Sequence, residues 1–385
     1  MFAERFKRKL TARREENLLR DPPVIETRAG KHVYIDGRRV LNFSSNDYLG
    51  LGVSRALGNR VAENFRRYHS SASSSRLVSA NYSLIRRAEK EYARYFGYED
   101  ALFFPSGYQA NIGVLSAFFD KKDTIIFDKH IHASSVKGMA LSGAAFRGYR
   151  HNSMAHLEKR LRIHAQGPTA VLTESLFSMD GDMLHIEAFG KLRRQYHFVS
   201  IVDEAHAFGA LGDKGRGLAR DVADIAVGTF GKALGFFGAF VLLPEQLKEY
   251  LFNFSSPLIY STSLPEAHAA SAMDILEIIH DRDDLRMNLR EVSHLMKESL
   301  IRRGFRVTGD RHILAVEIGR EDRAVAVAKH LLGKGVLVLP ARFPTVPLNR
   351  ALLRVSMTAL HTEADIGFFV NTLAEVFHDT GPADR

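Results

Sequence analysis

The sequence predicts an α/β protein whose large domain contains a mostly parallel sheet flanked by helices, followed by a smaller α+β domain. A chain of 385 residues is too long for one compact core, so more than one domain is the default. From about residue 83 onward, short apolar runs alternate with helical patterns, which indicates βαβ units. Near residue 265 the pattern changes to long helices and short strands. We expect an N-terminal arm over 1–45, a large domain over 46–280 and a small domain over 281–385.

The first residues are predicted to form an amphipathic helix. Phe2, Phe6 and Leu10 recur at helical spacing within a basic stretch. A basic, amphipathic start is also typical of a transit peptide, but Glu15 and Glu16 do not fit the acid-poor composition of one. We therefore favour an ordinary helix at this end of the chain.

Each further element is predicted from its own pattern. Residues 32–43, HVYIDGRRVLNF, read as a β-hairpin that turns at Asp36 and Gly37. Four strands follow, at the runs ALFFPSG, DTIIFD, AVLTES and FVSIVDEA. A helical pattern comes after each of the first three, and a glycine-rich loop after the fourth. In the small domain, helical patterns cover about 265–303 and about 322–333. Its strands are expected at FRVTG, ILAVEIG, VLVLP and LLRVSMTA, before a last helix.

Composition excludes several classes of protein. The chain has no cysteine, which excludes disulfides, thiol catalysis and thiolate metal sites and suits a reducing cytoplasm. No apolar run reaches the roughly 18 residues that a membrane span needs. The formal charge is +9, but the basic residues are scattered among acids and no nucleic-acid-binding signature is present. We expect a cytoplasmic protein with no metal, no nucleic acid and no membrane span, whose basic charge suits small anionic substrates.

Chemically useful residues follow the predicted strands, at the edge of the sheet where doubly wound proteins bind ligands. Ser106, Gly107 and Tyr108 form a strand-to-helix turn, where backbone N–H groups can bind a phosphate. His132 and Ser178 each follow a later strand. Taken singly, residues 106–108 also suit an ordinary helix start. His132 could equally be a surface histidine, and Ser178 could belong to a turn.

Three further residues make the pattern more specific. Asp203 ends a strand, and His206 follows it at the start of a glycine-rich segment. Lys232 lies among glycines and apolar residues, where a low dielectric lowers the pKa of an amine and favours a Schiff base. Alone, this lysine could equally reach into water from a surface turn. Together, a lysine, an acid, histidines and a phosphate-binding turn are the groups that a protein contributes to a pyridoxal phosphate site.

The chain resembles the α-oxoamine synthases, which are pyridoxal-phosphate enzymes of fold type I. The resemblance runs over nearly the whole chain and is carried by NFSSNDYLGL, FFPSGYQAN, DKHIHASS, TESLFSMDGD, VDEAHAFGALGDKGRG, GTFGKALG, LIYSTSLP and FPTVPLNRALLRVSMTALHT. It implies a seven-stranded sheet in the large domain. It also implies a homodimer with its active site at the subunit interface.

The resemblance also implies roles at the cofactor. Lys232 would form the Schiff base and later move the substrate's α-proton. Asp203 would keep the pyridine nitrogen protonated, and His132 would stack on the ring. The other residues that would contact the cofactor are Ser106, Gly107, Tyr108, Ser178, Thr229, Thr262, which the second subunit would donate to the phosphate, and His206, which would hydrogen-bond the phenolic oxygen.

Four residues match substrate contacts in the family. Arg354 matches the arginine that binds the amino-acid carboxylate, a task for which a bidentate guanidinium is suited. Asn46 and Thr345 match further substrate contacts, and Arg20 falls where an arginine lies near the substrate entrance. Without the resemblance, Arg354 would be interpreted as a surface arginine on a strand.

The implied reaction condenses an amino acid with an acyl thioester and releases CO2. The motifs SSNDYLGL, FSMDGD and IYSTSLP favour the biotin-pathway branch of the family, which joins L-alanine to a pimeloyl group carried by CoA or by an acyl carrier protein. Other branches remain open, including glycine C-acetyltransferases, serine palmitoyltransferases and synthases of long-chain amino-ketone signals. A non-catalytic partner subunit is a further alternative, against which the retained Lys232, Asp203 and His132 argue.

The chain departs from the family at one loop. Residues 69–80, which we call the serine loop, contain no glycine where relatives have a glycine-rich run, and Ile85 replaces a usual histidine. The small residues predict a structured loop rather than a linker. Because serine adopts a positive φ less easily than glycine, either the backbone avoids positive φ here or the shape of the pocket differs.

Overall fold

The computed structural model describes residues 2–165 and 167–379. By its internal contacts the chain divides into two units, and each is described by itself. The central unit comprises Leu51–Ser178 and Met183–Arg286, and the terminal unit comprises Met1–Gly50, Met179–Asp182 and Met287–Arg385. The domain boundaries predicted after residues 45 and 280 stay predictions.

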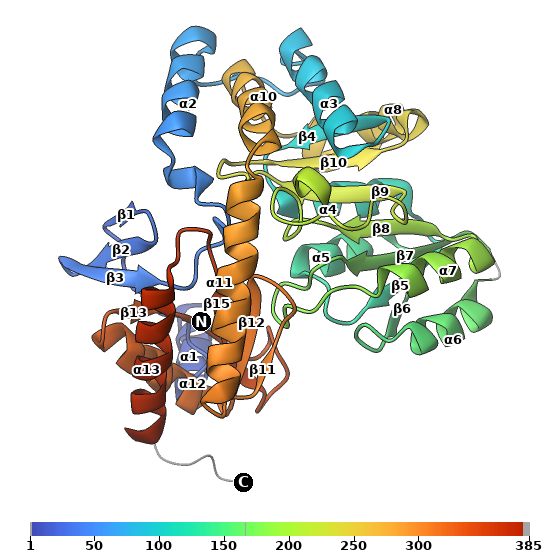
Figure 1. The fold of residues 1–385 in the computed structure, drawn as a ribbon. Helices are drawn as coiled ribbons and strands as arrows, with labels where there is room; N and C mark the ends of the chain where they lie inside the picture. The colour runs from blue at the N-terminus through green and yellow to red at the C-terminus, as the bar shows by residue number, and fades with distance from the viewer. Residues whose placement is uncertain (1, 166, 380–385) are drawn as a thin grey trace. The chain divides into compact units, whose positions relative to one another are not determined.

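The central unit contains a seven-stranded sheet, as predicted (Figure 1). Its spatial order is β4 (Asp100–Phe104), β10 (Ala239–Leu243), β9 (Ile225–Thr229), β8 (Val199–Asp203), β7 (Thr169–Glu174), β5 (Thr124–Asp128) and β6 (Ala145–Tyr149). The pairs from β9 to β6 are parallel, and only β10 runs antiparallel to its neighbours β4 and β9 among the paired strands. The sheet is therefore mostly parallel.

Helices cover both faces of this sheet. The side chains of β4 show this, because they point alternately to one face and to the other. Leu102 and Phe104 share a buried cluster with Val114 of α4 (Gly107–Phe118). Phe103, which points the other way, packs edge-on against Tyr92 of α3 (Ser83–Phe96) at 5.1 Å between ring centroids. The other α-helices that begin in this unit are α2 (Arg55–Tyr68), α5 (Ala133–Ser142), α6 (Met154–His164), α7 (Ile186–Tyr196), α8 (Glu245–Phe254), α9 (Ser256–Ile259), α10 (Glu266–His280) and α11 (Asp283–Arg302).

The strand ends of the central sheet place acidic side chains at one edge. Asp128, Glu174 and Asp203 are the last residues of β5, β7 and β8, and all three are buried. In the parallel ladder between β7 and β8, Glu174 lies directly opposite Asp203. Buried carboxylates need hydrogen-bond partners, so this edge is where polar structure is concentrated.

The terminal unit contains two four-stranded sheets. One has the order β1 (Thr27–Ala29), β2 (His32–Ile35), β3 (Arg38–Asn42) and β13 (Val336–Leu337). The other has the order β11 (Val307–Thr308), β12 (Ile313–Gly319), β15 (Ala351–Ser356) and β14 (Leu339–Ala341). Its remaining helices are α1 (Phe2–Glu15), α12 (Glu321–Gly333) and α13 (Glu363–Asp379). The N-terminal helix and the hairpin between β2 and β3 are confirmed.

The serine loop is structured and adopts positive φ without glycine. His69 ends α2 with φ 65°, and Ser73 has φ 49°. Arg76, within the same loop, is buried and forms an ion pair with Glu89 of α3, which is fully buried. The backbone therefore does not avoid positive φ, and this ion pair fixes the loop to the helix that follows it.

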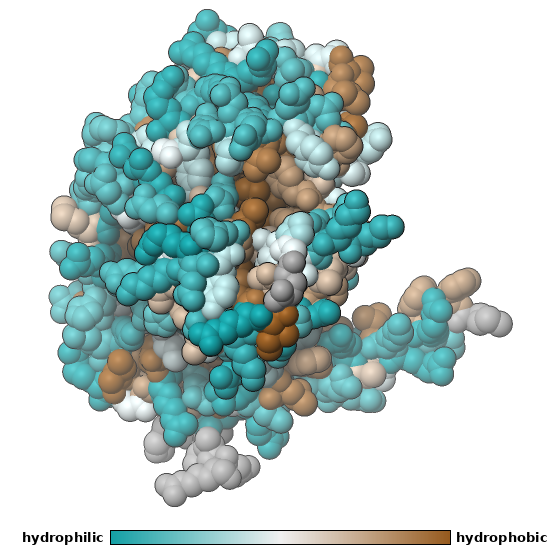
Figure 2. Space-filling model, turned by 90° about the vertical axis from the view of Figure 1, so that its right-hand side faces the viewer, coloured by the Kyte–Doolittle hydropathy of each residue, from teal (hydrophilic) through white to brown (hydrophobic). Residues whose placement is uncertain are grey.

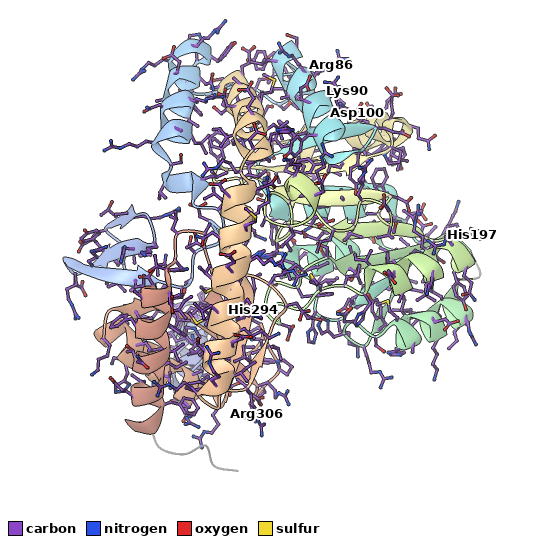
Figure 3. All side chains as sticks on the ribbon, in the orientation of Figure 1. Arg86, Lys90, Asp100, His197, His294 and Arg306 are labelled. Carbon is purple, nitrogen blue, oxygen red and sulfur yellow. The ribbon has the colours of Figure 1, made fainter. Side chains whose placement is uncertain are left out.

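The surface is polar, as expected of a folded chain with a substantial core. Hydrophilic side chains cover most of the face drawn in Figure 2. Ion pairs lie at the edge of the central sheet, where Asp100 contacts Lys90 and Lys248, each at 2.7 Å (Figure 3). Within the described residues, no helix combines the length and the apolar character that crossing a bilayer requires.

Candidate active site

Lys232 lies in a tight loop that follows β9. Its Nζ is 2.7 Å from Nε2 of His206, so the structure brings these two predicted residues together. The Thr229 hydroxyl donates to the Gly238 carbonyl at 3.0 Å and accepts the Gly231 N–H at 3.1 Å. Thr229, predicted to contact the cofactor, thus also closes the loop that carries the lysine.

Asp203 is held by two donors at the end of β8. Nδ2 of Asn111 donates to its Oδ2 at 2.9 Å, and the Ala205 N–H donates to its Oδ1 at 2.9 Å. The carboxylate is 8 % exposed. Hydrogen bonds of this kind stabilise a buried negative charge, which is the form that pairs with a protonated ring nitrogen.

His132 precedes α5 and is held in one tautomer. Its Nδ1 accepts from the Ser134 N–H at 3.3 Å and lies 2.7 Å from the Ser134 hydroxyl, which accepts from Asn111 at 3.0 Å. Because Nδ1 is an acceptor, the ring carries its proton on Nε2. Burial lowers the pKa of His132, and the charge of Lys232 acts in the same direction while that of Asp203 opposes it. The imidazole is therefore neutral at physiological pH.

The start of α4 offers backbone donors to an anion. Ser106 is the N-cap, and its hydroxyl accepts the Gln109 N–H at 3.3 Å. Gly107 and Tyr108 are the first residues of the helix, where N–H groups have no acceptor inside the helix. A Cβ on Gly107 would lie 4.0 Å from Cβ of Thr229, so the helix start lies beside the lysine loop. A phosphate fits this position.

These residues fit pyridoxal phosphate. The central unit supplies an amine on Lys232, a buried carboxylate on Asp203 and a helix start that can bind a phosphate. Ser178 is also buried, and its N–H donates to Glu174 at 3.3 Å. Thr262 lies after α9 and is exposed.

Two of the predicted substrate residues meet in the terminal unit. Arg354 on β15 is 4 % exposed, and its Nη1 donates to Oδ1 of Asn46 at 3.2 Å and to the Ser356 hydroxyl at 2.6 Å. Its Nη2 lies 3.5 Å from the Tyr48 hydroxyl, which donates to Asn46 at 3.0 Å. Burial raises the pKa of Tyr48. The guanidinium is thus held in a fixed orientation.

The other two predicted substrate residues are both associated with Arg342. Thr345 is exposed, and its N–H donates to the Arg342 carbonyl at 2.9 Å. Burial lowers the pKa of Arg342, and the charge of Arg20 lowers it further. Arg20 and Thr345 are therefore neighbours of one arginine, separate from the hydrogen bonds that join Asn46 to Arg354.

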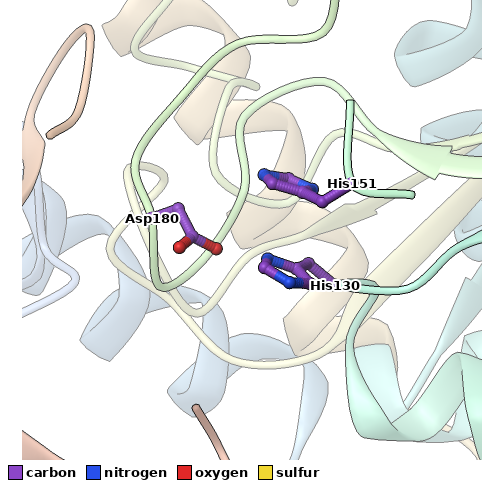
Figure 4. A group of neighbouring side chains, drawn as sticks. All are labelled: His130, His151 and Asp180. Carbon is purple, nitrogen blue, oxygen red and sulfur yellow. The ribbon is translucent and has the colours of Figure 1, made fainter. Parts of the chain in front are cut away.

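A second histidine in the DKHIHASS motif is packed within the central unit. The ring of His130 stacks on that of His151, with centroids 4.0 Å apart and planes 10° apart (Figure 4). Nδ1 of His151 lies 2.9 Å from Oδ1 of Asp128, which also accepts the His130 N–H at 2.8 Å. His130 thus packs against the ring of His151.

Sequence reasoning missed five polar residues in these sites. They all lie inside motifs that the resemblance used. Three of them, Tyr48, Asn111 and Glu174, contact residues that are distant in sequence. The sequence feature that could have identified them is their position, either just after a predicted strand or beside an assigned residue. The five are Tyr48, Asn111, Ser134, Glu174 and Ser356.

Comparisons with known proteins identify the family. The family model for aminotransferase class I and II matches residues 38–373. An 8-amino-7-oxononanoate synthase of Photobacterium profundum is 38% identical and covers 98% of both chains. A serine palmitoyltransferase structure from S. paucimobilis with a bound PLP–myriocin aldimine is 26% identical, covers 97% of both chains and has a TM-score of 0.91. An 8-amino-7-oxononanoate synthase structure from Francisella tularensis is 29% identical, covers 87% of this chain and 97% of its own, and has a TM-score of 0.76.

Proposed function

Because the chain belongs to the class I and II aminotransferase family, and within it to the α-oxoamine synthases, we propose that it joins L-alanine to a pimeloyl thioester in biotin biosynthesis. The chain is a pyridoxal-phosphate-dependent acyltransferase. The observation that supports the choice of substrates is the similarity to 8-amino-7-oxononanoate synthases over nearly the full length of the chain. The product is then 8-amino-7-oxononanoate.

The proposed reaction is a decarboxylative condensation. The α-carbon of alanine forms a bond to the thioester carbonyl carbon, and the thiol leaves. The amino-acid carboxyl group departs as CO2, and a proton replaces it at the α-carbon. The amine of alanine is retained in the product, so one thiol and one CO2 are released for each turnover.

When bound, pyridoxal phosphate supplies an electron sink for the bonds that break at the α-carbon. Lys232 would bind the cofactor through Nζ and move the proton at the substrate's α-carbon, and its 2.7 Å contact with His206 orients the amine. Asp203 would hold the ring nitrogen in its protonated form. His132, which carries its only proton on Nε2, would contact the ring.

In the same proposal, Arg354 binds the carboxylate of the amino acid. Its hydrogen bonds to Asn46 and Ser356 hold the guanidinium in place before the substrate arrives. A preorganised arginine binds a carboxylate with less loss of side-chain freedom. Thr345 and Arg20 are proposed to contact the substrate near its entrance, on the side of Arg342.

The assembly completes the proposed site. We expect a homodimer in the cytoplasm, with Thr262 of each chain reaching the cofactor phosphate of the other. The exposed hydroxyl of Thr262 supports this assignment. The acyl carrier is proposed to be CoA or an acyl carrier protein, since both present a thioester at the end of the same phosphopantetheine group.

A synthase for a longer acyl chain is the second candidate. The TM-score with serine palmitoyltransferase, 0.91, is higher than the 0.76 found with 8-amino-7-oxononanoate synthase. Because relatives share the cofactor residues and differ in the acyl pocket, those residues do not distinguish the two substrates. A serine-using or long-chain enzyme would therefore keep the cofactor residues described above.

A thiol-release assay tests the proposal. Alanine, glycine and serine are each combined with pimeloyl, acetyl, succinyl and palmitoyl thioesters of CoA, and with pimeloyl acyl carrier protein. Alanine with a pimeloyl thioester is expected to be the fastest pair, and activity only with palmitoyl-CoA would refute it. Lys232→Ala is expected to abolish both turnover and the visible absorption of the cofactor's Schiff base.

A further inference from the structure

We propose that Glu174 is a positioning residue that holds His132 and Ser178 in place at the cofactor. The inference rests on the proposed function, which assigns His132 to the cofactor ring, and on the resemblance, which implies that Ser178 also contacts the cofactor. Glu174 itself is the last residue of β7, where it is 2 % exposed. It reaches its two partners through their backbone N–H groups.

The contacts join two segments that are far apart along the chain. Oε1 of Glu174 accepts the His132 N–H at 2.6 Å, and Oε2 accepts the Ser178 N–H at 3.3 Å. His132 lies between β5 and α5, whereas Ser178 lies four residues after Glu174 itself. One carboxyl group therefore links His132, which is assigned to the ring face, to Ser178, which is assigned as a further cofactor contact.

The same side chain faces a second acid. Glu174 lies opposite Asp203 in the ladder between β7 and β8. Burial raises the pKa of Glu174, and the charge of Asp203 raises it further, whereas Lys232 and the two N–H donors act in the opposite direction. With Glu174 protonated, Asp203 provides the negative charge for the ring nitrogen without a second carboxylate beside it.

A neutral acceptor is therefore sufficient at position 174. A glutamine adds no charge and keeps one carbonyl oxygen for the shorter contact, with the His132 N–H at 2.6 Å, while its amide nitrogen gives up the longer contact, with the Ser178 N–H at 3.3 Å. A methionine has nearly the same length but no oxygen, so it would leave two buried N–H groups without this acceptor. The pair of variants separates the hydrogen-bonding role of Glu174 from its role in filling space.

The experiment measures cofactor binding directly. Pyridoxal phosphate is titrated into the wild-type apoprotein, Glu174→Gln and Glu174→Met, and binding is followed by the visible absorption of the Schiff base. We expect Glu174→Gln to bind within about threefold of the wild type. We expect Glu174→Met to bind about tenfold more weakly, the effect of losing one buried acceptor, and to shift the pH midpoint of the visible band.

Asp128→Asn is the matched control. Asp128 ends the neighbouring strand β5, is fully buried and accepts the N–H groups of His130 at 2.8 Å and Asn152 at 2.7 Å. We expect this variant to lower the melting temperature while the pH midpoint of the visible band stays unchanged.

Two results would overturn the inference about Glu174. One is a Glu174→Met variant with wild-type affinity and pH midpoint. The other is a Glu174→Met variant whose cofactor binding and pH midpoint change only as much as those of Asp128→Asn. A wild-type protein that takes up no cofactor would overturn the proposed function and this inference together, so the two failures are distinguishable.

Discussion

Lowering the pH from 7 to 5 is expected to destabilise the central unit through His268 in α10. This histidine is fully buried, and its Nε2 donates to the Phe237 carbonyl at 2.6 Å. Its ring packs against Phe230 and Phe236, with centroids 4.9 and 4.8 Å away. Burial lowers the pKa of His268 to about 4, although the hydrogen bond to Phe237 acts in the opposite direction.

The size of the effect follows from proton linkage. An unfolded histidine has a pKa of about 6.5, so below that pH the unfolded state binds a proton that the folded state does not bind. The contribution of neutral His268 to the free energy of unfolding is therefore complete above pH 6.5, and it falls as the pH decreases toward the pKa of the folded state. Between pH 7 and pH 5 this single group is expected to cost about 2 kcal/mol of the free energy of unfolding.

Urea unfolding at pH 7, 6 and 5, followed by circular dichroism, measures this cost. His268→Gln keeps a side-chain N–H that can donate to Phe237 but does not titrate, so its unfolding free energy should fall by about 2 kcal/mol less than that of the wild type. His294→Gln on the exposed face of α11 is the control, and it should parallel the wild type (Figure 3). Parallel pH profiles for the wild type and His268→Gln would refute the reasoning.

Three other substitutions have defined outcomes. Ser73→Gly should raise the melting temperature, because φ of 49° costs a serine about 1 kcal/mol; an unchanged or lower value would contradict this. Arg76→Met should lower the free energy of unfolding, measured by urea titration, by about 3 kcal/mol, since buried Glu89 loses its arginine although it keeps Lys248 at 3.2 Å; an unchanged value would contradict this. Arg354→Lys should raise KM for the amino acid about tenfold with a smaller change in kcat, because lysine lacks the bidentate geometry; steady-state kinetics with an unchanged KM would exclude the assigned role.

Periodicity and turn chemistry predicted most of the fold. The hairpin turn at Asp36 and Gly37 and the alternation of strands with helices were readable because each is a local signal. The antiparallel direction of β10 was not readable, since a fully buried strand is a continuous apolar run in either direction. The direction of a strand depends on the strands with which it pairs in the folded chain.

The residues that were predicted in the candidate site are those whose side chains have a specific chemical role at the cofactor. Lys232 and His206 were assigned from the resemblance, and the structure places their nitrogens in contact. Asn111 and Glu174 were missed, because an amide or a carboxyl at a strand end has many structural uses. Asn111 acquires its role only through Asp203, which is 92 positions away in the chain.

Asn111 also controls where protons can travel. Its amide nitrogen donates one hydrogen bond toward Asp203 and one toward Ser134, which lies next to Nδ1 of His132. An amide nitrogen of this kind cannot accept a proton and pass it on, unlike a water molecule or a hydroxyl group. The acid and the imidazole therefore influence each other through charge alone, with no route along these hydrogen bonds by which one could protonate the other. A water molecule at this position could pass a proton between the two groups, whereas the amide nitrogen cannot.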